Sequence, residues 1–199
     1  MHGLIFRTVE AFVSDSFGPE AWAKAVACSD LEVASFEAML QYDPAHFPKL
    51  LNGCARALNR PQSVILEDIG AYLITHQNHA SVRRLMRFGG DTFPELLRSL
   101  DDLPGRTRLA VSGLDLPQVQ VRETIPHHFM ISCRGEPQGF GHVLVGLLRA
   151  MADDYGTLAV LDHQGVRNGS EVIDVRVIET FFAEDRGFTL ARAAEEETT

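Results

Sequence analysis

The spacing of apolar residues changes near residue 115, and this change limits the fold more than any other feature of the chain. Before it, apolar residues recur at helical spacing, as in Ile5, Val9, Phe12 and Val13. After it, the segment PQVQVRE (117–123) alternates polar and apolar residues, which is typical of a strand with one buried face. The sequence therefore predicts helices first and a sheet second.

The first half contains several amphipathic segments separated by glycine and proline. Gly18-Pro19 ends the first helix, and Pro19 suits the first turn of the next. We expect the last helix of this half to end at Leu103, because Pro104 disfavours a helical residue before it. The predicted helices cover residues 1–17, 19–28, 46–59, 61–76, 81–90 and 91–103.

The second half predicts four strands and one long helix. Asn168-Gly169 is the dipeptide typical of a two-residue hairpin turn. The order of elements predicts an α+β fold, with helices packed on a four-stranded antiparallel sheet. The predicted strands cover 117–123, 127–134, 157–165 and 172–182, and the helix covers 140–156.

No linker or repeat divides the chain. We expect one domain over residues 1–185, with a helical part at about 1–105, a sheet-containing part at about 106–185, and a polar tail at 186–199. A net charge of −9 argues against nucleic acid or an anionic membrane surface as a partner, because both favour a basic face.

Cysteine spacing and hydropathy indicate the compartment. Cys28, Cys54 and Cys133 are widely spaced and form no C-x-x-C motif, so neither a disulfide framework nor a common zinc site is predicted. No apolar run reaches the roughly 18 residues that a membrane span needs. We therefore expect a soluble protein of the reducing cytoplasm.

Few residues in the sequence indicate catalysis or metal binding. His76 and His79 have a spacing that metal ligands use on helices, but no third ligand is near in sequence, so surface or capping roles are favoured. No serine lies in the sharp Gly-x-Ser-x-Gly turn of an acyl-transfer nucleophile. The sequence does not predict an enzyme.

Ser132 and Arg134 lie two residues apart on a predicted strand, so both project from one face. A hydroxyl and a guanidinium side by side can bind a carboxylate or a phosphate. Spacing alone favours the alternative, in which Arg134 simply reaches solvent.

Several of these segments together resemble the H-NOX (haem NO/oxygen-binding) domain family over about residues 1–185. They are the opening MHGLIF, Gly70 after an acidic stretch, LLRSLDDL followed by a proline-led strand, and SCR before a glycine-containing helix. The resemblance implies a helical part packed on a part with an antiparallel sheet, and haem held between them. It also implies sensing of nitric oxide or oxygen and regulation of a cyclase, a kinase or a cyclic-dinucleotide enzyme.

Individual residues can be matched to the family. Ile5 matches an apolar residue against the haem face, Pro117 a proline that distorts the macrocycle, and Leu144 a residue lining the pocket. Ser132 and Arg134 match the end of the Tyr-x-Ser-x-Arg motif that binds the haem propionates. Met130 occupies the tyrosine position of this motif and lacks the phenolic donor.

The residue at the family's iron-ligand position is Pro104, because the ligand histidine directly follows an L-x-x-L segment that matches LDDL here. Proline offers iron no nitrogen ligand. Among the other histidines, His128 shares strand parity with Met130, Ser132 and Arg134 and is the first reserve ligand. His76 and His79 come next.

Two interpretations follow. We expect a non-catalytic sensory or regulatory domain with an altered or absent haem site, which binds a small amphipathic ligand or haem and acts in trans on a histidine kinase or diguanylate cyclase. The alternative is a haem-based sensor of nitric oxide or oxygen that uses a non-standard axial ligand. An enzyme ranks third, because no pair of nucleophile and base can be assigned.

Overall fold

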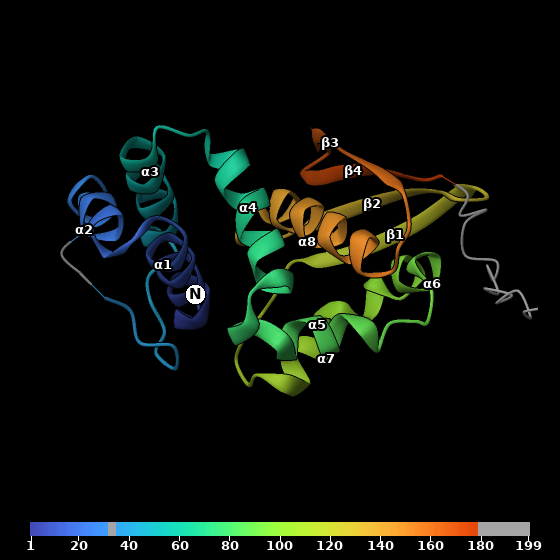
Figure 1. Cartoon of the computed structure of the whole chain (residues 1–199), viewed down its shortest axis with the longest axis horizontal. Helices are drawn as coiled ribbons and strands as arrows, with labels where there is room; N and C mark the ends of the chain where they lie inside the picture. The colour runs from blue at the N-terminus through green and yellow to red at the C-terminus, as the bar shows by residue number, and fades with distance from the viewer. Residues whose placement is uncertain (32–34, 179–199) are drawn as a thin grey trace, which may run out of the picture.

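The computed structural model describes residues 1–31 and 35–178, which form a helical N-terminal part and a C-terminal part built on one sheet (Figure 1). The helical part holds four of the helices. They are α1 (Gly3–Phe17), α2 (Pro19–Ala27), α3 (His46–Leu58) and α4 (Gln62–Thr75). The expected order of helices before strands is therefore confirmed.

The first helix is fixed at both ends and along one face. His2 caps α1 by accepting the Leu4 N–H at its Nδ1 atom (3.2 Å), and Gly18 ends the helix with a positive φ of 90°. Glu10, which is only 8% exposed, pairs with Arg7 and accepts the Phe36 N–H at 3.3 Å. This buried carboxylate ties the segment before α3 to the first helix.

A row of short helices connects the two parts. They are η1 (Gln77–His79), α5 (Ala80–Arg87), α6 (Phe93–Arg98), η2 (Leu100–Asp102) and α7 (Leu103–Ala110). Thr92 begins α6 with a capping box that it completes with Glu95.

The prediction that Pro104 ends a helix is wrong. The helix expected over 91–103 breaks at Ser99, and Pro104 lies in the first turn of α7. Proline is tolerated there because a first-turn N–H has no partner within the helix. The boundary expected near residue 105 accordingly falls inside α7.

The sheet has four antiparallel strands in the order β1-β2-β4-β3. The Asn168–Gly169 turn is confirmed, with positive φ values of 52° and 74° that suit a hairpin. His127 was expected to begin a strand but lies in the β1–β2 turn with φ 66°, so the strand starts one residue later. The strands are β1 (Gln118–Ile125), β2 (His128–Arg134), β3 (Ala159–Arg167) and β4 (Ser170–Val177).

Both edges of the sheet are interrupted. The Asp101 carboxylate of η2 accepts the Val121 N–H of β1 at 2.6 Å. The register of β3 against β4 shifts between His163 and Val166. The first feature occupies an outward backbone donor of β1, and the second makes the edge strand β3 irregular.

The helix α8 (Phe140–Asp154) lies between α4 and the sheet and joins the two parts (Figure 1). Its Gly146 approaches the Glu67 carbonyl of α4 so closely that a Cβ atom would overlap it. Gly70 of α4 approaches the Val143 carbonyl of α8 in the same way. The two helices therefore touch through their backbones.

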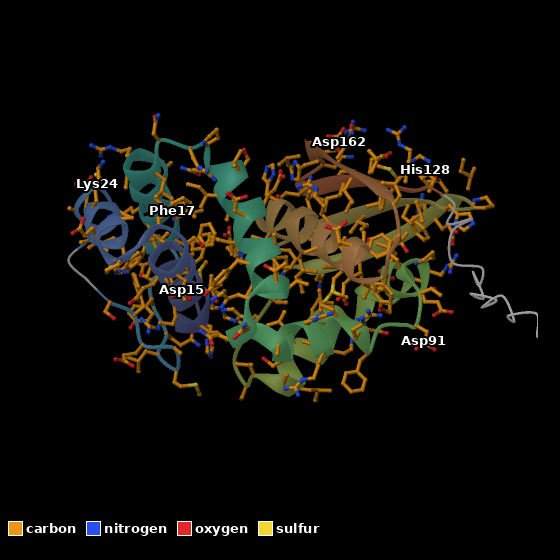
Figure 2. The ribbon with its side chains drawn as sticks, viewed as in Figure 1. Asp15, Phe17, Lys24, Asp91, His128 and Asp162 are labelled. Carbon is orange, nitrogen blue, oxygen red and sulfur yellow. The ribbon has the colours of Figure 1, made fainter. Side chains whose placement is uncertain are left out.

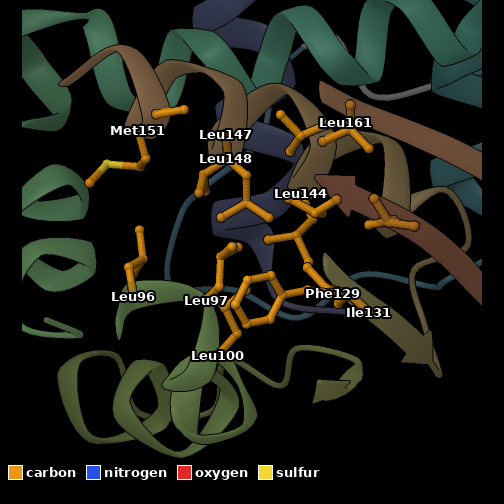
Figure 3. Close-up of a cluster of buried hydrophobic side chains, with 14 of the residues drawn as sticks. Leu96, Leu97, Leu100, Phe129, Ile131, Leu144, Leu147, Leu148, Met151 and Leu161 are labelled. Carbon is orange, nitrogen blue, oxygen red and sulfur yellow. The ribbon is translucent and has the colours of Figure 1, made fainter. Parts of the chain in front are cut away.

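The buried side chains form two groups. The first, which we call the aromatic cluster, lies among α1–α4 and includes Phe6, Phe12, Trp22, Phe36, Phe47 and Tyr72. The second, the aliphatic cluster, lies between α6–η2, α8 and the inner face of the sheet (Figure 3). Its central members are Leu96, Leu97, Leu100, Phe129, Ile131, Leu144, Leu148 and Met151.

Candidate functional site

Position 104 lies at the start of α7, against the rim of the aliphatic cluster. Pro104 is half-buried, and its neighbours Leu103 and Thr107 are buried. Its nitrogen belongs to an amide and carries no lone pair for a metal. The α6–α7 segment (93–110) contains neither histidine nor cysteine that could replace it.

Four residues expected at the site share one face of β2. His128, Met130, Ser132 and Arg134 alternate with the buried Phe129, Ile131 and Cys133, and therefore project from the outer face, opposite α8. Met130 and Ser132 line a depression of about 490 Å³ together with residues of β1 and Val172 of β4. Arg134 is exposed and has no ion-pair partner among the residues that the structure describes.

His128 already has a partner on this face. Its Nε2 atom lies 2.7 Å from an Asp174 carboxylate oxygen, and Arg176 lies 3.0 Å from the other oxygen. Burial acts to raise the pKa of Asp174, but the hydrogen bonds from His128 and Arg176 outweigh it and hold the pKa below its usual value. The His128 side chain is thus held against Asp174 at the end of the sheet (Figure 2).

The expected pocket-lining residues lie in different parts of the molecule. Ile5 packs against the aromatic cluster, whereas Leu144 has no exposed surface and belongs to the aliphatic cluster (Figure 3). Pro117 is buried at the start of β1 beside Gly135. The structure therefore divides these residues between the two clusters and the end of the sheet.

His76 and His79 belong to a polar cluster between α1 and α4. The Tyr72 hydroxyl donates to Asp15 at 2.6 Å, and His76 stacks on the Tyr72 ring at 4.7 Å. Burial and the neighbouring His76 lower the pKa of His79, although Asp15 acts in the opposite direction. Within residues 1–31 and 35–178, no three His, Cys, Asp or Glu side chains are arranged to hold a metal ion.

The N-terminus of α8 carries a carboxylate that the sequence did not indicate. Glu171 of β4 accepts the N–H groups of Gly139 and Gly141 at 2.9 and 3.0 Å. His163 contacts the same carboxylate at 3.1 Å and stacks on His142 with ring centroids 3.8 Å apart. Such a carboxylate satisfies free amides and interacts favourably with the helix dipole.

In the sequence, the positions of the glycines near residue 141 were the signal that could have indicated this contact. A Cβ atom at residue 141 would lie 2.6 Å from a Glu171 carboxylate oxygen, so the carboxylate would have to shift to admit it. Gly141 of the segment GEPQGFG therefore leaves space for the Glu171 carboxylate at this helix terminus.

All three cysteines are free. Burial raises the pKa of Cys54 and of Cys133 to about 12, so neither thiol ionises near neutral pH. These two residues act as small apolar groups of the core.

Comparison with known proteins places the fold. The family model described as haem-NO-binding matches residues 2–163. The chain belongs to this family. H-NOX domains, as its members are called, are haem-binding sensor domains and are not catalysts themselves.

Curated relatives are longer proteins. Soluble guanylate cyclase gcy-31 of Caenorhabditis elegans is 21% identical over 154 residues, which are 77% of this chain and 22% of that protein. Soluble guanylate cyclase 89Db of Drosophila melanogaster is 20% identical over 155 residues, 78% of this chain and 23% of that protein. The chain thus matches less than a quarter of either relative.

Solved H-NOX structures have the same fold. The Fe(II) unliganded H-NOX protein of K. algicida aligns with a TM-score of 0.78 at 17% identity, over 92% of this chain and 99% of that one. An S. oneidensis H-NOX protein in the Fe(II)NO state aligns with a TM-score of 0.73 at 15% identity, over 90% of this chain and 100% of that one. The expected α+β fold is confirmed.

The residues at the positions matched to the H-NOX haem site can be tested against haem. Pro104 supplies no donor atom for iron, and Met130 supplies no hydroxyl for a propionate. Leu97, Leu100 and Leu144 have no exposed surface and belong to the aliphatic cluster (Figure 3). This set of side chains does not fit a haem ligated through residue 104.

Proposed function

We propose that this chain is a regulatory H-NOX domain that works without a haem ligated at the family position and acts on a separate signalling protein. The observation that carries the proposal is Pro104 in the first turn of α7. Axial ligation sets the redox and ligand-binding properties of haem iron. A proline at this position removes that control while leaving the helix in place.

The packing of the aliphatic cluster supports the same conclusion. Phe129, Leu97, Leu100 and Leu144 have no exposed surface, and side chains from α6, η2, α8 and β2 fill the space between these elements. Protein interiors of this kind are close-packed, so a flat macrocycle would have to displace several of these side chains. The free energy gained by burying a porphyrin, roughly 25 cal/mol per Å² of apolar surface, would then be offset by the loss of existing contacts.

The residues around the matched propionate positions support it as well. Ser132 and Arg134 face away from Leu144 across the sheet. The N-terminus of α8, which follows them in the chain, already binds Glu171. An anionic ligand at that terminus would have to compete with this internal carboxylate.

An absorbance spectrum tests the proposal. We expect protein produced with excess haem precursor to carry haem far below one equivalent and to show no Soret shift on addition of nitric oxide. The matched variant is Pro104→His, which restores an imidazole at the start of α7 and is expected to raise haem retention. One equivalent of imidazole-ligated haem in the wild-type chain would overturn the proposal.

The second candidate is a haem sensor with a different ligand, and the position of His128 favours it. His128 shares the outer face of β2 with Ser132 and Arg134, so an imidazole and an anion-binding pair lie along one strand. Under this alternative, haem binds to the wild-type chain and is lost in His128→Ala. The corresponding variants His76→Ala and His79→Ala would retain it.

The class of partner is inferred from the family and not from a binding site in this chain. We propose a separate effector of the histidine kinase or diguanylate cyclase type, in the cytoplasm, where the three free thiols stay reduced. The described helices include none long and apolar enough to span a bilayer. Addition of the purified domain is expected to change the rate of kinase autophosphorylation or of cyclic-dinucleotide synthesis, and an unchanged rate for both classes would contradict this assignment.

A further inference from the structure

The outer face of the sheet carries an exposed apolar group where β4 ends. Leu158, Val160 and Ile178 are 64%, 46% and 47% exposed, and the Ile178 N–H donates to the Leu158 carbonyl at 2.9 Å. The helices that the structure describes pack on the inner face or along the β1 edge and leave this group uncovered. Adjacent exposed apolar side chains of this size indicate a contact surface.

The same face carries two arginines with no partner. Arg122 of β1 and Arg134 of β2 are exposed and form no ion pair with any residue of the described ranges. Between them lies the depression of about 490 Å³, whose lining includes Met130, Ser132 and Val172. The face therefore carries an apolar group at one end and Arg134 at the other, with Arg122 and the carboxylates of Asp162 and Asp174 between them.

The chain itself supplies a segment of matching chemistry. Residues 179–199 read ETFFAEDRGFTLARAAEEETT, with apolar Phe181, Phe182, Phe188 and Leu190 ahead of the acidic run Glu195–Glu197. Six acidic residues against two arginines make the segment negative overall. In the segment, the apolar residues come before the acidic run. On the face, the apolar group lies where β4 ends, and the arginines lie farther from that point.

The distances also agree. β4 ends beside the β1–β2 turn, where the Val177 N–H donates to the His127 carbonyl at 2.9 Å. From this turn to Arg134 the sheet extends over the seven residues of β2, about 23 Å at the rise of a strand. The residues from 179 to 195 span up to about 55 Å when extended, so the acidic run can reach both arginines.

We propose that residues 179–199 of this chain bind back onto the outer face of the sheet. The phenylalanines cover Leu158, Val160 and Ile178, and Glu195–Glu197 pair with Arg122 and Arg134. Bound in this way, the segment occupies the Ser132–Arg134 pair and competes with any acidic partner for it. The inference is independent of whether the domain binds haem.

A spin label on the segment tests the proposal in the full chain. Thr189→Cys, made together with Cys28→Ser, places the label between Phe188 and Leu190, because the buried Cys54 and Cys133 do not react. We expect strong broadening of the backbone amide signals of Met130, Ser132 and Val172, and none for α2 and α3. Unchanged intensities on the outer face would overturn the proposal.

A mixed sample distinguishes binding of the segment to its own chain from binding to a second copy. Isotope-labelled protein without the spin label is mixed with spin-labelled protein that carries no isotope. We expect no broadening of the outer-face signals in this mixture. Broadening equal to that of the single-chain sample would replace the proposal with binding between two copies.

Charge reversal supplies the matched comparison. Arg122→Glu and Arg134→Glu are each expected to lower the ratio of bound to free segment by roughly threefold, the size typical of an exposed ion pair. Arg84→Glu is the control, because Arg84 is exposed on α5 and also has no ion-pair partner among the described residues. Equal losses in all three variants would contradict the assignment of the acidic run to these two arginines.

Discussion

The aromatic and aliphatic clusters are both buried cores, but they are built from different kinds of side chain. In the aromatic cluster, rings meet edge-on or stacked, as Phe6 does with Phe36 at 4.7 Å and with Phe47 at 5.9 Å. Polar groups are built into this cluster, including the buried Glu10 and the Tyr72–Asp15 hydrogen bond. The aliphatic cluster instead keeps its ion pairs at the rim, such as Arg98 with Glu123.

This difference shows how each half obtains a unique structure. Hydrogen bonds to buried carboxylates are directional, so they fix how the loops of the helical part lie against α1. In the sheet-containing part, close packing of leucines against Phe129 fixes the arrangement of the core, and its least exposed carboxylates, Asp154 and Glu171, lie at the two ends of α8. The comparison predicts that the helical part is sensitive to loss of single polar groups and the sheet-containing part to loss of volume.

The largest effect is expected from removing volume in the aliphatic cluster. Leu144→Ala deletes most of a side chain with no exposed surface and leaves a cavity, which should lower the free energy of unfolding by about 3 kcal/mol. Leu109→Ala is the control, because Leu109 of α7 is 91% exposed and the change should stay within about 0.5 kcal/mol. Urea denaturation followed by circular dichroism measures both, and equal losses would break the comparison.

The junction of the two halves should be nearly as sensitive. Gly146→Ala places a methyl group against the Glu67 carbonyl, which is backbone and can move only with α4, so we expect a loss of about 2 kcal/mol. Gly105→Ala is the matched control, since a Cβ atom there meets no neighbour. A Gly146→Ala protein as stable as the wild type in the same denaturation assay would show that the two clusters are not held together by this helix contact.

The buried carboxylate of the helical part comes third. Glu10→Ala leaves the Phe36 N–H without its acceptor and Arg7 without its partner, which should cost about 1.5 kcal/mol. Glu20→Ala, at an exposed position of α2, serves as the control. Hydrogen exchange at Phe36 provides a local readout, and unchanged protection there would show that Glu10 does not order this segment.

The smallest effect is expected on the stability of the protein at acidic pH. Because the pKa of His79 is lowered in the folded protein, the unfolded chain takes up the proton first as the pH falls through about 6.5, and stability falls with it. His79→Gln should reduce the difference between the urea midpoints at pH 7.5 and pH 5.5. If the variant shows the wild-type difference, the acid sensitivity lies outside this polar cluster of the helical part.

Much of the fold could be predicted from local pattern. The change of apolar period located the sheet, and Asn168–Gly169 identified its hairpin, because both signals depend on residues close in sequence. The break at Ser99 was missed, since a proline permits either a helix end or a first-turn position and the sequence does not separate the two. His127 was missed for a related reason, as its turn conformation depends on the strands that it joins.

The candidate site was less predictable because its partners are distant in sequence. Strand parity placed His128, Met130, Ser132 and Arg134 on one face, which is confirmed, but the pairing of His128 with Asp174 joins residues 46 positions apart. The Glu171 carboxylate at α8 lies 30 and 32 positions from the glycines that it binds. Pattern alone does not reveal such long-range contacts.

The interrupted edges of the sheet have a consequence for how the protein behaves in a crowded solution. Open strand edges recruit strands from other molecules and begin aggregation. Here Asp101 occupies a backbone donor of β1, and the register shift against β4 makes β3 irregular. Both interruptions disfavour the addition of a strand from a neighbouring molecule at the edges of the sheet.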